Sequence, residues 1–585
     1  MAAKDVYVLG LSCFYHDSAA CILKNGEVLA AASEERFTRK KHDAAFPEKA
    51  LQYCLKHAGI SASELTAVGF YDKPFLKFER IIQTYLQEFP RGFKSYLRAV
   101  PVWLNQKLWM RREIEKRIKD YGGEILFVEH HLSHAASAFM VSPFQDAAIL
   151  TIDGVGEWAT SSMGVGRGSS IELTHEIRFP HSLGLLYSAF TYYLGFKVNS
   201  AEYKVMGLAP YGEPKYVDTI LKELVEVRDD GSFRLNLDYF CYMYDLKMTN
   251  SRMEKLFGHP VREGEGKLDQ FHKDLAASIQ KVTELIVLNM TRELHRISGM
   301  KYLCMAGGVA LNCVANGKVL RQGLFEDLFV QPAAGDAGGA LGVASYLHHA
   351  YLGNERWYKF KSPFLGPEYT EEEIQQTMDA FGARSRRVSD AELLKETARI
   401  IADKNVVGWF QGRMEYGPRS LGSRSILGDA RFAEMRDTVN LKIKFRESFR
   451  PFAPTVLAEK VSEWFDLDRE SPYMLLVADV LPDKRTIPAV THVDHSARIQ
   501  TIARDDNPRF YDLVREYEKI TGCPVIINTS FNVRGEPIVM SPKDAYLCFM
   551  RTHMDYLVMG NFILDKREQA ALREDVDWRK EFVLD

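Results

Sequence analysis

The sequence has little of what marks specialised classes of protein. Its 585 residues carry 75 Lys and Arg against 78 Asp and Glu, a net charge of −3. The chain as a whole therefore lacks the basic excess that is typical of nucleic-acid or anionic-membrane binding. Its eight cysteines are scattered and form no C-x-x-C pair. This spacing argues against a zinc knuckle or a redox site and favours buried, reduced thiols.

Long apolar runs are also missing. No run reaches the roughly 18 to 20 residues needed to span a bilayer. The apolar N-terminal run is interrupted by His16 and Asp17 and lacks the basic flank and cleavage pattern of a signal peptide. We therefore expect a cytoplasmic protein without a membrane partner. Because one hydrophobic core stops growing at roughly 250 to 300 residues, we also expect at least two domains.

The pattern that is present is α/β. VYVLGLS and SAACILKNGEVLAAAS predict a β-hairpin, and AAILTIDGVGEWATSS repeats that pattern. KYLCMAGGVALNC and LFVQPAAGDAGGALG each predict a strand, a Gly-rich turn and a helix. The periodicity weakens over 356–388. We therefore predict a first domain over 1–355, a linker over 356–388 and a second α/β domain over 389–585.

The stretch at about 73–120 differs from its surroundings. Residues 73–119 carry 12 Lys or Arg against 4 Asp or Glu, with aromatic residues between them. This composition predicts an inserted helical region. Amphipathic helices that pack on their own domain commonly look like this, and a nucleic-acid surface is the alternative interpretation.

Three polar Gly-rich turns follow predicted strands in the first domain: GLSCFYHDSAA, TIDGVGEWATS and AGGVALN. Glycines allow backbone N–H groups to approach a phosphate closely. The order of these turns resembles that in the superfamily of sugar kinases, actin and heat-shock ATPases. This resemblance implies a domain with two related lobes, and nucleotide binding by Gly307, Gly308 and Asn312.

A candidate metal site also lies in the first domain. His130 and His134 are four residues apart, which places both imidazoles on one face of a helix. Asp153 and Asp336 follow predicted strands and are candidates to complete the ligand set. A mixed set of imidazole and carboxylate suits iron, manganese or zinc better than magnesium. The alternative is that the two histidines only pack or face solvent.

The second domain contains cations separated by apolar or small residues, unlike a solvated charged face. Arginine and lysine in this setting suit a phosphate or carboxylate ligand, and the INTSFN string offers short polar side chains beside them. The predicted anion-binding residues are Arg419, Lys444, Arg450, Arg498, Asn528 and Ser530. Structural salt bridges are the alternative for this set.

Seven strings spread over nearly the whole chain carry a closer resemblance. They are EERFTRKKHD, HHLSHAASA, EYKVMGLAPYG, AGGVALNC, GRMEYGPRSLGSRSIL, KFRESFRPFAP and NTSFNVRGEPIV. With them the chain resembles the NodU and CmcH carbamoyltransferases, which include antibiotic-tailoring enzymes. The resemblance implies an N-terminal domain like the tRNA threonylcarbamoyl-transferase subunit, which is of the actin-like superfamily, and a YrdC-like C-terminal domain.

The resemblance also implies a reaction and its residues. The C-terminal domain would convert carbamoyl phosphate and ATP, with Mg²⁺, into a carbamoyl-adenylate held by the anion-binding set. The N-terminal domain would transfer the carbamoyl group to a hydroxyl of a small-molecule acceptor. The four candidate ligands, His130, His134, Asp153 and Asp336, would hold an iron-type metal, Fe(II), in the transfer site. His16 and Lys41 would act at the transfer centre, with His16 as the general base.

Two other functions stay open at this point. A small-molecule kinase of the actin-like superfamily would phosphorylate the acceptor instead. A tRNA-modifying carbamoylating enzyme would use the basic insert to bind nucleic acid. The sequence does not identify the acceptor, and it leaves a homodimer open.

Overall fold

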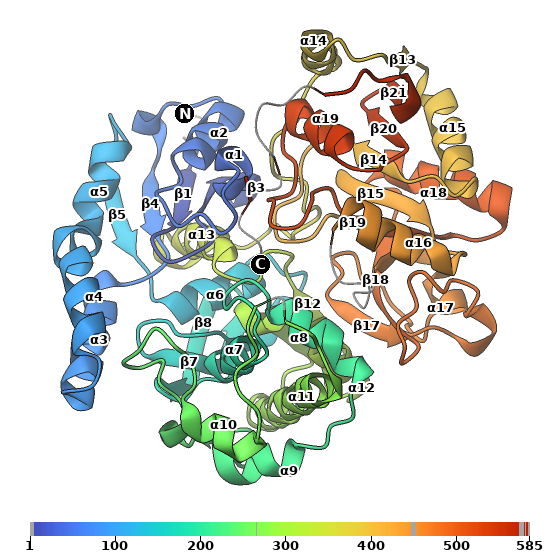
Figure 1. The fold of residues 1–585 in the computed structure, drawn as a ribbon. Coiled ribbons are helices and arrows are strands. Elements are labelled where there is room, and N and C mark those ends of the chain that lie inside the picture. Colours follow the sequence, from blue (N-terminus) through green and yellow to red (C-terminus); the bar gives the residue numbers. More distant parts are fainter. Residues whose placement is uncertain (1–4, 265, 446–451, 573–577, 579–580, 583–585) are drawn as a thin grey trace. The chain divides into compact units, whose positions relative to one another are not determined.

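The computed structural model describes residues 5–264, 266–445, 452–572, 578 and 581–582. The chain forms two compact units. Unit 1 comprises residues 1–34 and 42–360, and unit 2 comprises residues 35–41 and 361–585 (Figure 1). All eight cysteines are buried and free of disulfides. Among the described helices, none combines the length and the apolar character that a membrane crossing requires.

Unit 1 contains two five-stranded sheets. The order of the first is β3-β2-β1-β4-β5 and that of the second is β12-β11-β6-β7-β8. The strands of the first sheet are β1 (Tyr7–Ser12), β2 (Ala19–Lys24), β3 (Glu27–Ser33), β4 (Ala67–Phe70) and β5 (Glu124–Phe127). Those of the second are β6 (Asp146–Ile152), β7 (Ala159–Arg167), β8 (Ser170–Arg178), β11 (Tyr302–Ala306) and β12 (Asp327–Val330).

The two sheets share one topology. In the first, β1–β2–β3 form an antiparallel meander, and β4 and β5 continue the sheet parallel to β1. In the second, β6–β7–β8 form the meander, and β11 and β12 continue it parallel to β6. This repetition confirms the predicted α/β fold with two related lobes.

Two helices of unit 1 pack closely on each other. They are α6 (His130–Phe139), which contacts β6 and β11, and α13 (Ala337–Tyr346), which contacts β1 and β2. A Cβ on Gly342 of α13 would lie 1.9 Å from the backbone oxygen of Ser133 in α6. No side chain fits at that distance, so the glycine-rich AAGDAGGALG string permits this close packing. This close packing fixes the distance between α6 and α13. The predicted metal ligands lie on or next to these two helices.

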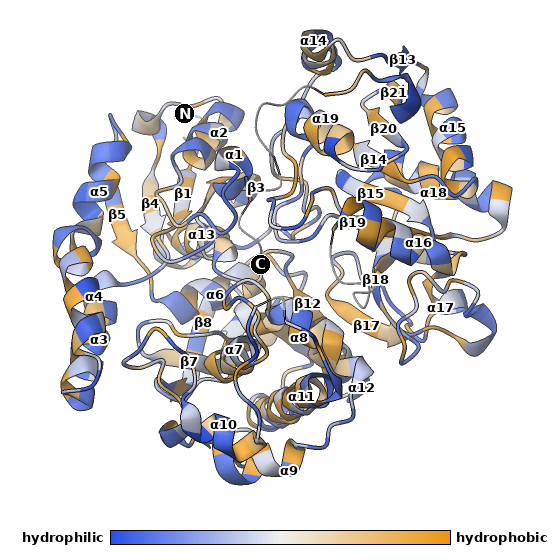
Figure 2. Cartoon of the chain, viewed as in Figure 1, coloured by the Kyte–Doolittle hydropathy of each residue, from blue (hydrophilic) through white to orange (hydrophobic). Residues whose placement is uncertain are grey.

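The segment that connects β4 to β5 is helical. Its helices are α3 (Pro74–Glu88), α4 (Phe93–Asn105) and α5 (Met110–Arg117). Figure 2 shows hydrophilic and hydrophobic residues side by side on α3 and α4. Trp103 and Ile114 are buried, whereas Phe75, Leu86 and Phe89 are exposed. The inserted segment therefore buries one apolar face and leaves other apolar side chains in solvent.

Unit 2 is built on a mixed nine-stranded sheet in the order β13-β21-β20-β14-β15-β19-β16-β18-β17. Helices α15 (Asp390–Ala402) and α18 (Pro508–Thr521) pack against each other, and α14 (Glu371–Phe381) packs against α19 (Pro542–Arg551). The strands are β13 (Arg386–Arg387), β14 (Val407–Phe410), β15 (Arg424–Asp429), β16 (Ala453–Leu457), β17 (Leu476–Asp479), β18 (Ser496–Ile502), β19 (Val525–Ser530), β20 (Tyr556–Met559) and β21 (Phe562–Asp565).

A short piece of the N-terminal sequence belongs to unit 2 by its contacts. It contains the helix α1 (Glu35–Thr38). Within this piece Arg36 donates a hydrogen bond to the backbone oxygen of Gly417 at 2.9 Å, and Arg39 donates to that of Ile538 at 2.7 Å. The local sequence pattern gives no sign of this connection across several hundred residues.

Candidate functional site

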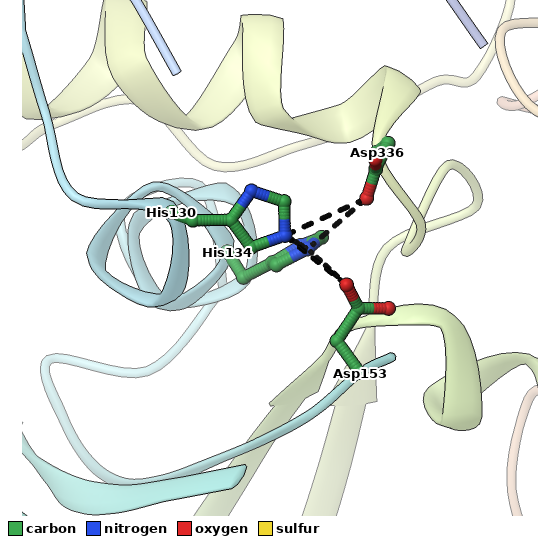
Figure 3. A group of neighbouring side chains, drawn as sticks. All are labelled: His130, His134, Asp153 and Asp336. Atoms are coloured by element: carbon green, nitrogen blue, oxygen red, sulfur yellow. Dashed lines mark hydrogen bonds and ion pairs between the residues drawn. The ribbon is translucent and has the colours of Figure 1, made fainter. Parts of the chain in front are cut away.

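Four buried side chains of unit 1 converge on one point (Figure 3). His130 and His134 come from the first turns of α6, Asp153 directly follows β6, and Asp336 precedes α13. One ligand-type atom from each of the four lies within 4.8 Å of all the others. These are the four residues predicted as metal ligands, and the structure brings them together.

The spacing within this group suits a shared cation. The Nε2 atoms of His130 and His134 are 3.1 Å apart, and the Nε2 of His130 is 3.1 Å from the Oδ2 of Asp153. The Oδ1 of Asp336 lies 3.5 Å from the Nε2 of His134. Tetrahedral ligands with metal bonds of about 2.0 to 2.2 Å are roughly 3.4 Å apart. The donor set of two imidazoles and two carboxylates matches a divalent transition metal.

Asp336 gives the clearest sign that a cation belongs here. Its side chain is 1% exposed, and within the described part of the chain neither carboxylate oxygen accepts a hydrogen bond. A buried carboxylate without hydrogen bonds is costly. Burial disfavours a charged His134, but the nearby carboxylates of Asp153 and Asp336 outweigh this effect and raise its pKa to about 9. A bound metal would replace the proton that these carboxylates draw to the imidazole.

The AGGVALN turn holds Asp153 in place. The N–H of Gly308 donates to the Oδ1 of Asp153 at 2.8 Å, so the other carboxylate oxygen faces the histidines. Gly307 has a φ of +92°, and a Cβ there would lie 2.2 Å from the backbone oxygen of Ile152. The turn therefore requires glycine at this position.

Asn312, the third residue predicted to bind nucleotide, has internal partners. Its Oδ1 accepts from the N–H of Ala315 at the start of α12 (Cys313–Arg321), and its Nδ2 donates to Gln280 at 3.0 Å. The side chain thus caps a helix. Nucleotide binding by Gly307, Gly308 and Asn312 stays a prediction.

His16 lies beside the same cluster. Its Nε2 is 3.6 Å from the Oδ2 of Asp336, and its Nδ1 is 3.0 Å from the Oδ2 of Asp17. Burial opposes a charged imidazole, but Asp336 and Asp17 together raise the pKa of His16 well above its ordinary value. The predicted base therefore lies next to the group of His130, His134, Asp153 and Asp336, which we call the metal-type cluster.

Asp17 also holds a second histidine that sequence reasoning missed. Its Oδ1 is 2.7 Å from the Nδ1 of His42, whose Nε2 is 2.9 Å from the Oγ of Ser200. Asp17 and His42 have φ values of 53° and 56°, which are strained for non-glycine residues. The repeated His-Asp pairs in FYHDS and KKHD were a signal that could have pointed to these residues.

Lys41, the other residue predicted at the transfer centre, is half-buried and groups with unit 2, whereas His16 belongs to unit 1. The structure does not bring the two together within one unit. The role of Lys41 stays a prediction.

In unit 2, Lys444 and Ser530 meet. The Lys444 side chain is 2% exposed, and its Nζ donates to the Oγ of Ser530 at 3.2 Å. It also donates to the backbone oxygen and to the Oδ1 of Asn532, at 3.0 and 2.7 Å. The lysine thus stabilises the turn that follows β19.

Asn528 lies on the same strand and faces a glutamine of β18. Its Nδ2 donates to the Oε1 of Gln500 at 2.7 Å, while its buried Oδ1 has no hydrogen-bond partner among the described residues. Because side chains alternate along a strand, Ser530 shares the face of Asn528, and Arg498 shares that of Gln500. Because the side chains of Asn528 and Gln500 are hydrogen-bonded to each other, both pairs of residues lie on the same face of the sheet. Four of the predicted residues therefore lie on or beside it: Lys444, Arg498, Asn528 and Ser530.

Arg419 lies half-buried in the loop between β14 and β15. A carboxylate organises this loop, because the Oε1 of Glu415 accepts from the N–H groups of Leu421 at 2.8 Å and Ser423 at 2.7 Å. Gln500 donates to the backbone oxygen of Leu421 at 2.8 Å. The loop is thereby tied to the face that carries Asn528. Arg450 lies outside the described residues.

Comparisons with known proteins agree with both units. The profile of the Carbamoyltransferase N-terminus matches residues 7–345, and that of the Carbamoyltransferase C-terminus matches residues 398–566. The chain belongs to the carbamoyltransferase family. It is therefore an enzyme, as the sequence resemblance implied.

Relatives of this carbamoyltransferase match over nearly its full length. The uncharacterized protein sll1178 of Synechocystis sp. is 53% identical over 99% of this chain and 100% of its own. The nodulation protein NolNO of Sinorhizobium fredii is 39% identical over 97% of this chain and 81% of its own. Among solved structures, T. kodakarensis HypF is 15% identical over 60% of this chain and 48% of its own, with a TM-score of 0.30.

Sequence reasoning missed three polar side chains of unit 2 in this carbamoyltransferase. They are Glu415, which organises the Arg419 loop, Gln500, which bonds Asn528, and Asn532, which bonds Lys444. Asn532 and Glu415 stand inside the strings that carry the family resemblance. Gln500 gives no such signal, because its partner is reached only through the strand register.

Proposed function

We propose that this enzyme is an ATP-dependent O-carbamoyltransferase. Unit 2 converts carbamoyl phosphate, one water and ATP, bound as its Mg²⁺ complex, into a carbamoyl-adenylate. Water releases phosphate from carbamoyl phosphate, and the resulting carbamate oxygen bonds to the α-phosphorus of ATP as pyrophosphate leaves. Unit 1 transfers the carbamoyl group to a hydroxyl of a small-molecule natural product. The observation that carries the proposal is the presence of two different buried polar groups, one in each unit, each within its own carbamoyltransferase profile.

The face of unit 2 that carries Asn528 supports the first reaction. The unbonded, buried Oδ1 of Asn528 is an acceptor that a carbamoyl amide N–H would satisfy. Arg498 lies on the same face, and Arg419 stands in the adjoining loop. Guanidinium groups suit the phosphate oxygens of carbamoyl phosphate or of the adenylate. A site that recognises both an amide and a phosphate matches carbamoyl phosphate, which contains both groups.

The cluster of unit 1 supports the second reaction. His130, His134, Asp153 and Asp336 would hold a divalent metal, which we propose to be Fe(II). When bound, such an ion supplies Lewis-acid polarisation of a carbonyl. Water would be kept from the reacting group by the burial of all four side chains.

The neighbouring histidine completes the transfer. Asp17 accepts from the Nδ1 of His16. A metal held by Asp336 would offset the carboxylate charge that raises the pKa of His16, which would leave the Nε2 unprotonated and able to take the proton of the acceptor hydroxyl. The hydroxyl oxygen then bonds to the carbamoyl carbon, the bond from that carbon to the adenylate oxygen breaks, and AMP leaves. Because alcohols are weak nucleophiles at neutral pH, a positioned base is required.

We further propose that the enzyme acts in the cytoplasm. Its use of ATP and its eight buried, free thiols fit a reducing compartment.

Mass spectrometry of candidate alcohols tests the function. Incubation with ATP and carbamoyl phosphate should add one carbamoyl group to the acceptor and release AMP and pyrophosphate. Omission of either donor should abolish the product. A phosphorylated acceptor with ADP would instead identify a kinase and contradict the proposal.

A further inference from the structure

Arg80, in the second turn of α3, is a buried cation that forms no ion pair with any described residue. The residue is 8% exposed, and its Nε is buried and makes no hydrogen bond. Within the described part of the chain, no hydrogen bond or ion pair reaches the guanidinium. The ring of Phe179 lies beside it, with its centroid 4.9 Å from the Cζ. Lys77, one turn earlier, is equally buried but pairs with Asp72 at 2.7 Å. Of these two cations, Lys77 alone has a counter-ion among the residues that the structure describes.

Contacts connect this part of α3 with the metal-type cluster. The carboxylate of Glu157 accepts from the N–H of Lys73, just before α3, at 2.8 Å and from the N–H of His130 at 3.1 Å. The Nζ of Lys77 is 5.8 Å from the ring centroid of Tyr71, whose ring is 5.3 Å from that of His130. Lys77 and Arg80 are three residues apart and share a helix face. Arg80 therefore stands on the face of α3 that turns toward the transfer centre.

The guanidinium keeps its charge in this setting. Burial lowers the pKa of Arg80 to about 10, although Tyr15, Glu157 and Asp72 favour the charged form. Arg80 is thus protonated at neutral pH. A contact with an aromatic face compensates only part of the cost of burying a cation. An oxyanion that accepts two parallel hydrogen bonds would compensate far more.

We propose that Arg80 binds an oxyanion, a phosphate or a carboxylate, of a substrate at the transfer centre of unit 1. The inference rests on the proposed function for the identity of that substrate. One source is the phosphate of the carbamoyl-adenylate, and the other is an anionic group on the acceptor. In the second case the enzyme selects anionic alcohols.

A stability measurement on the full chain tests the site without any assay of activity. Arg80→Met keeps an apolar stem but removes the unpaired charge, so in a buffer without polyvalent anions its melting temperature should equal or exceed that of the unchanged protein. Sulfate should then raise the melting temperature of the unchanged protein more than that of the variant. The phosphate-type site of unit 2 is identical in both proteins, so its contribution cancels.

Arg111→Met is the matched control, because Arg111 lies in the same inserted segment but is exposed and pairs with Glu115 at 3.1 Å. It should respond to sulfate like the unchanged protein. A lowered melting temperature of Arg80→Met together with an unchanged response to sulfate would overturn the proposal and make Arg80 a structural residue. This result would leave the proposed function untouched.

AMP release without an acceptor then assigns the source of the anion. With ATP and carbamoyl phosphate alone, slow attack by water takes the place of attack by the acceptor, and only the donor contacts Arg80. A roughly ten- to a hundred-fold slower release in Arg80→Met, the loss expected for a charge-assisted hydrogen bond, assigns the adenylate phosphate. An unchanged release, with the sulfate difference present, assigns an anionic acceptor.

Discussion

The cluster of His130, His134, Asp153 and Asp336 in unit 1 differs from the sheet face of unit 2 that carries Asn528 in the kind of partner that it lacks. Around His130 and His134 the converging atoms are ring nitrogens and carboxylate oxygens, and the oxygens of Asp336 accept no hydrogen bond among the described residues. In unit 2, Lys444 is surrounded by oxygen acceptors of its own chain. The first group is suited to a cation from outside, whereas the cation of the second is already held by the protein.

This difference indicates how each group uses its ligand. A cluster of acceptors gains stability whenever a metal binds, because the metal neutralises charges that the fold has buried. The face of unit 2 leaves one acceptor open, the Oδ1 of Asn528. In the proposed function this face therefore binds a small substrate and releases its product without a large change in stability. A resident cofactor and an exchanging substrate would be expected to differ in this way.

The largest effect is expected from His134→Ala, which should affect the reaction proposed for unit 1 but not that proposed for unit 2. His134→Ala should lower the metal content and reduce carbamoyl transfer more than a hundred-fold, because direct ligands matter more than the outer residues whose loss costs about 10 to 100-fold. Pyrophosphate release dependent on carbamoyl phosphate should persist, since it is proposed for unit 2. Metal analysis and both rates check this.

His131→Gln is the control for that variant. His131 is buried in the same helix but bonds Thr151 at 2.7 Å and lies outside the ligand set. Its metal content should stay near that of the unchanged protein. Full transfer by a metal-free His134→Ala preparation would show that the cluster needs no cation.

The second expected effect concerns the open acceptor of unit 2. Asn528→Leu should raise the KM for carbamoyl phosphate roughly ten- to a hundred-fold, because a buried polar group of the substrate would lose its partner. Metal content should not change. Thr455→Val is the control, since Thr455 donates to the same Gln500 at 2.6 Å but offers the substrate no acceptor. Equal KM values for the two variants would mean that Asn528 only supports the network.

The two units also differ in how far the sequence could predict them. The spacing of His130 and His134 is a local helical pattern, and the two lobes follow from hairpin and Gly-rich strings that occur twice. Asp153 and Asp336 are candidate ligands because each follows a predicted strand, but no local rule brings Asp336 to histidines some 200 positions away. The family resemblance implies that grouping, and the folded chain shows it. The docking of Arg36 on Gly417 and the bond from Asn528 to Gln500 depend on contacts and strand register that only the folded chain defines.

A smaller effect is expected at Arg419. Arg419→Lys keeps the charge of the loop but loses the planar pair of donors. We expect a roughly ten-fold lower kcat/KM for carbamoyl phosphate with a nearly unchanged melting temperature. Arg504→Lys, at an exposed arginine that pairs with Asp512 at 3.3 Å, serves as the control. A lowered melting temperature with normal kinetics would give Arg419 a structural role instead.

The smallest expected effect tests how far the organisation of unit 1 extends beyond the cluster. Ser200 stands at the far end of the Ser200–His42–Asp17–His16 series, so its loss should leave His16 oriented by Asp17. Ser200→Ala should lower kcat only about two- to ten-fold, the range of a neutral hydrogen bond, and leave KM unchanged. Ser188→Ala is the control, because Ser188 is similarly buried in unit 1 but bonds Glu202 at 2.8 Å. A loss of kcat above a hundred-fold in Ser200→Ala alone, at normal metal content and melting temperature, would contradict this expectation. The serine, histidine and aspartate would then act as one catalytic unit, and the chemistry of unit 1 would not be confined to the metal-type cluster and His16.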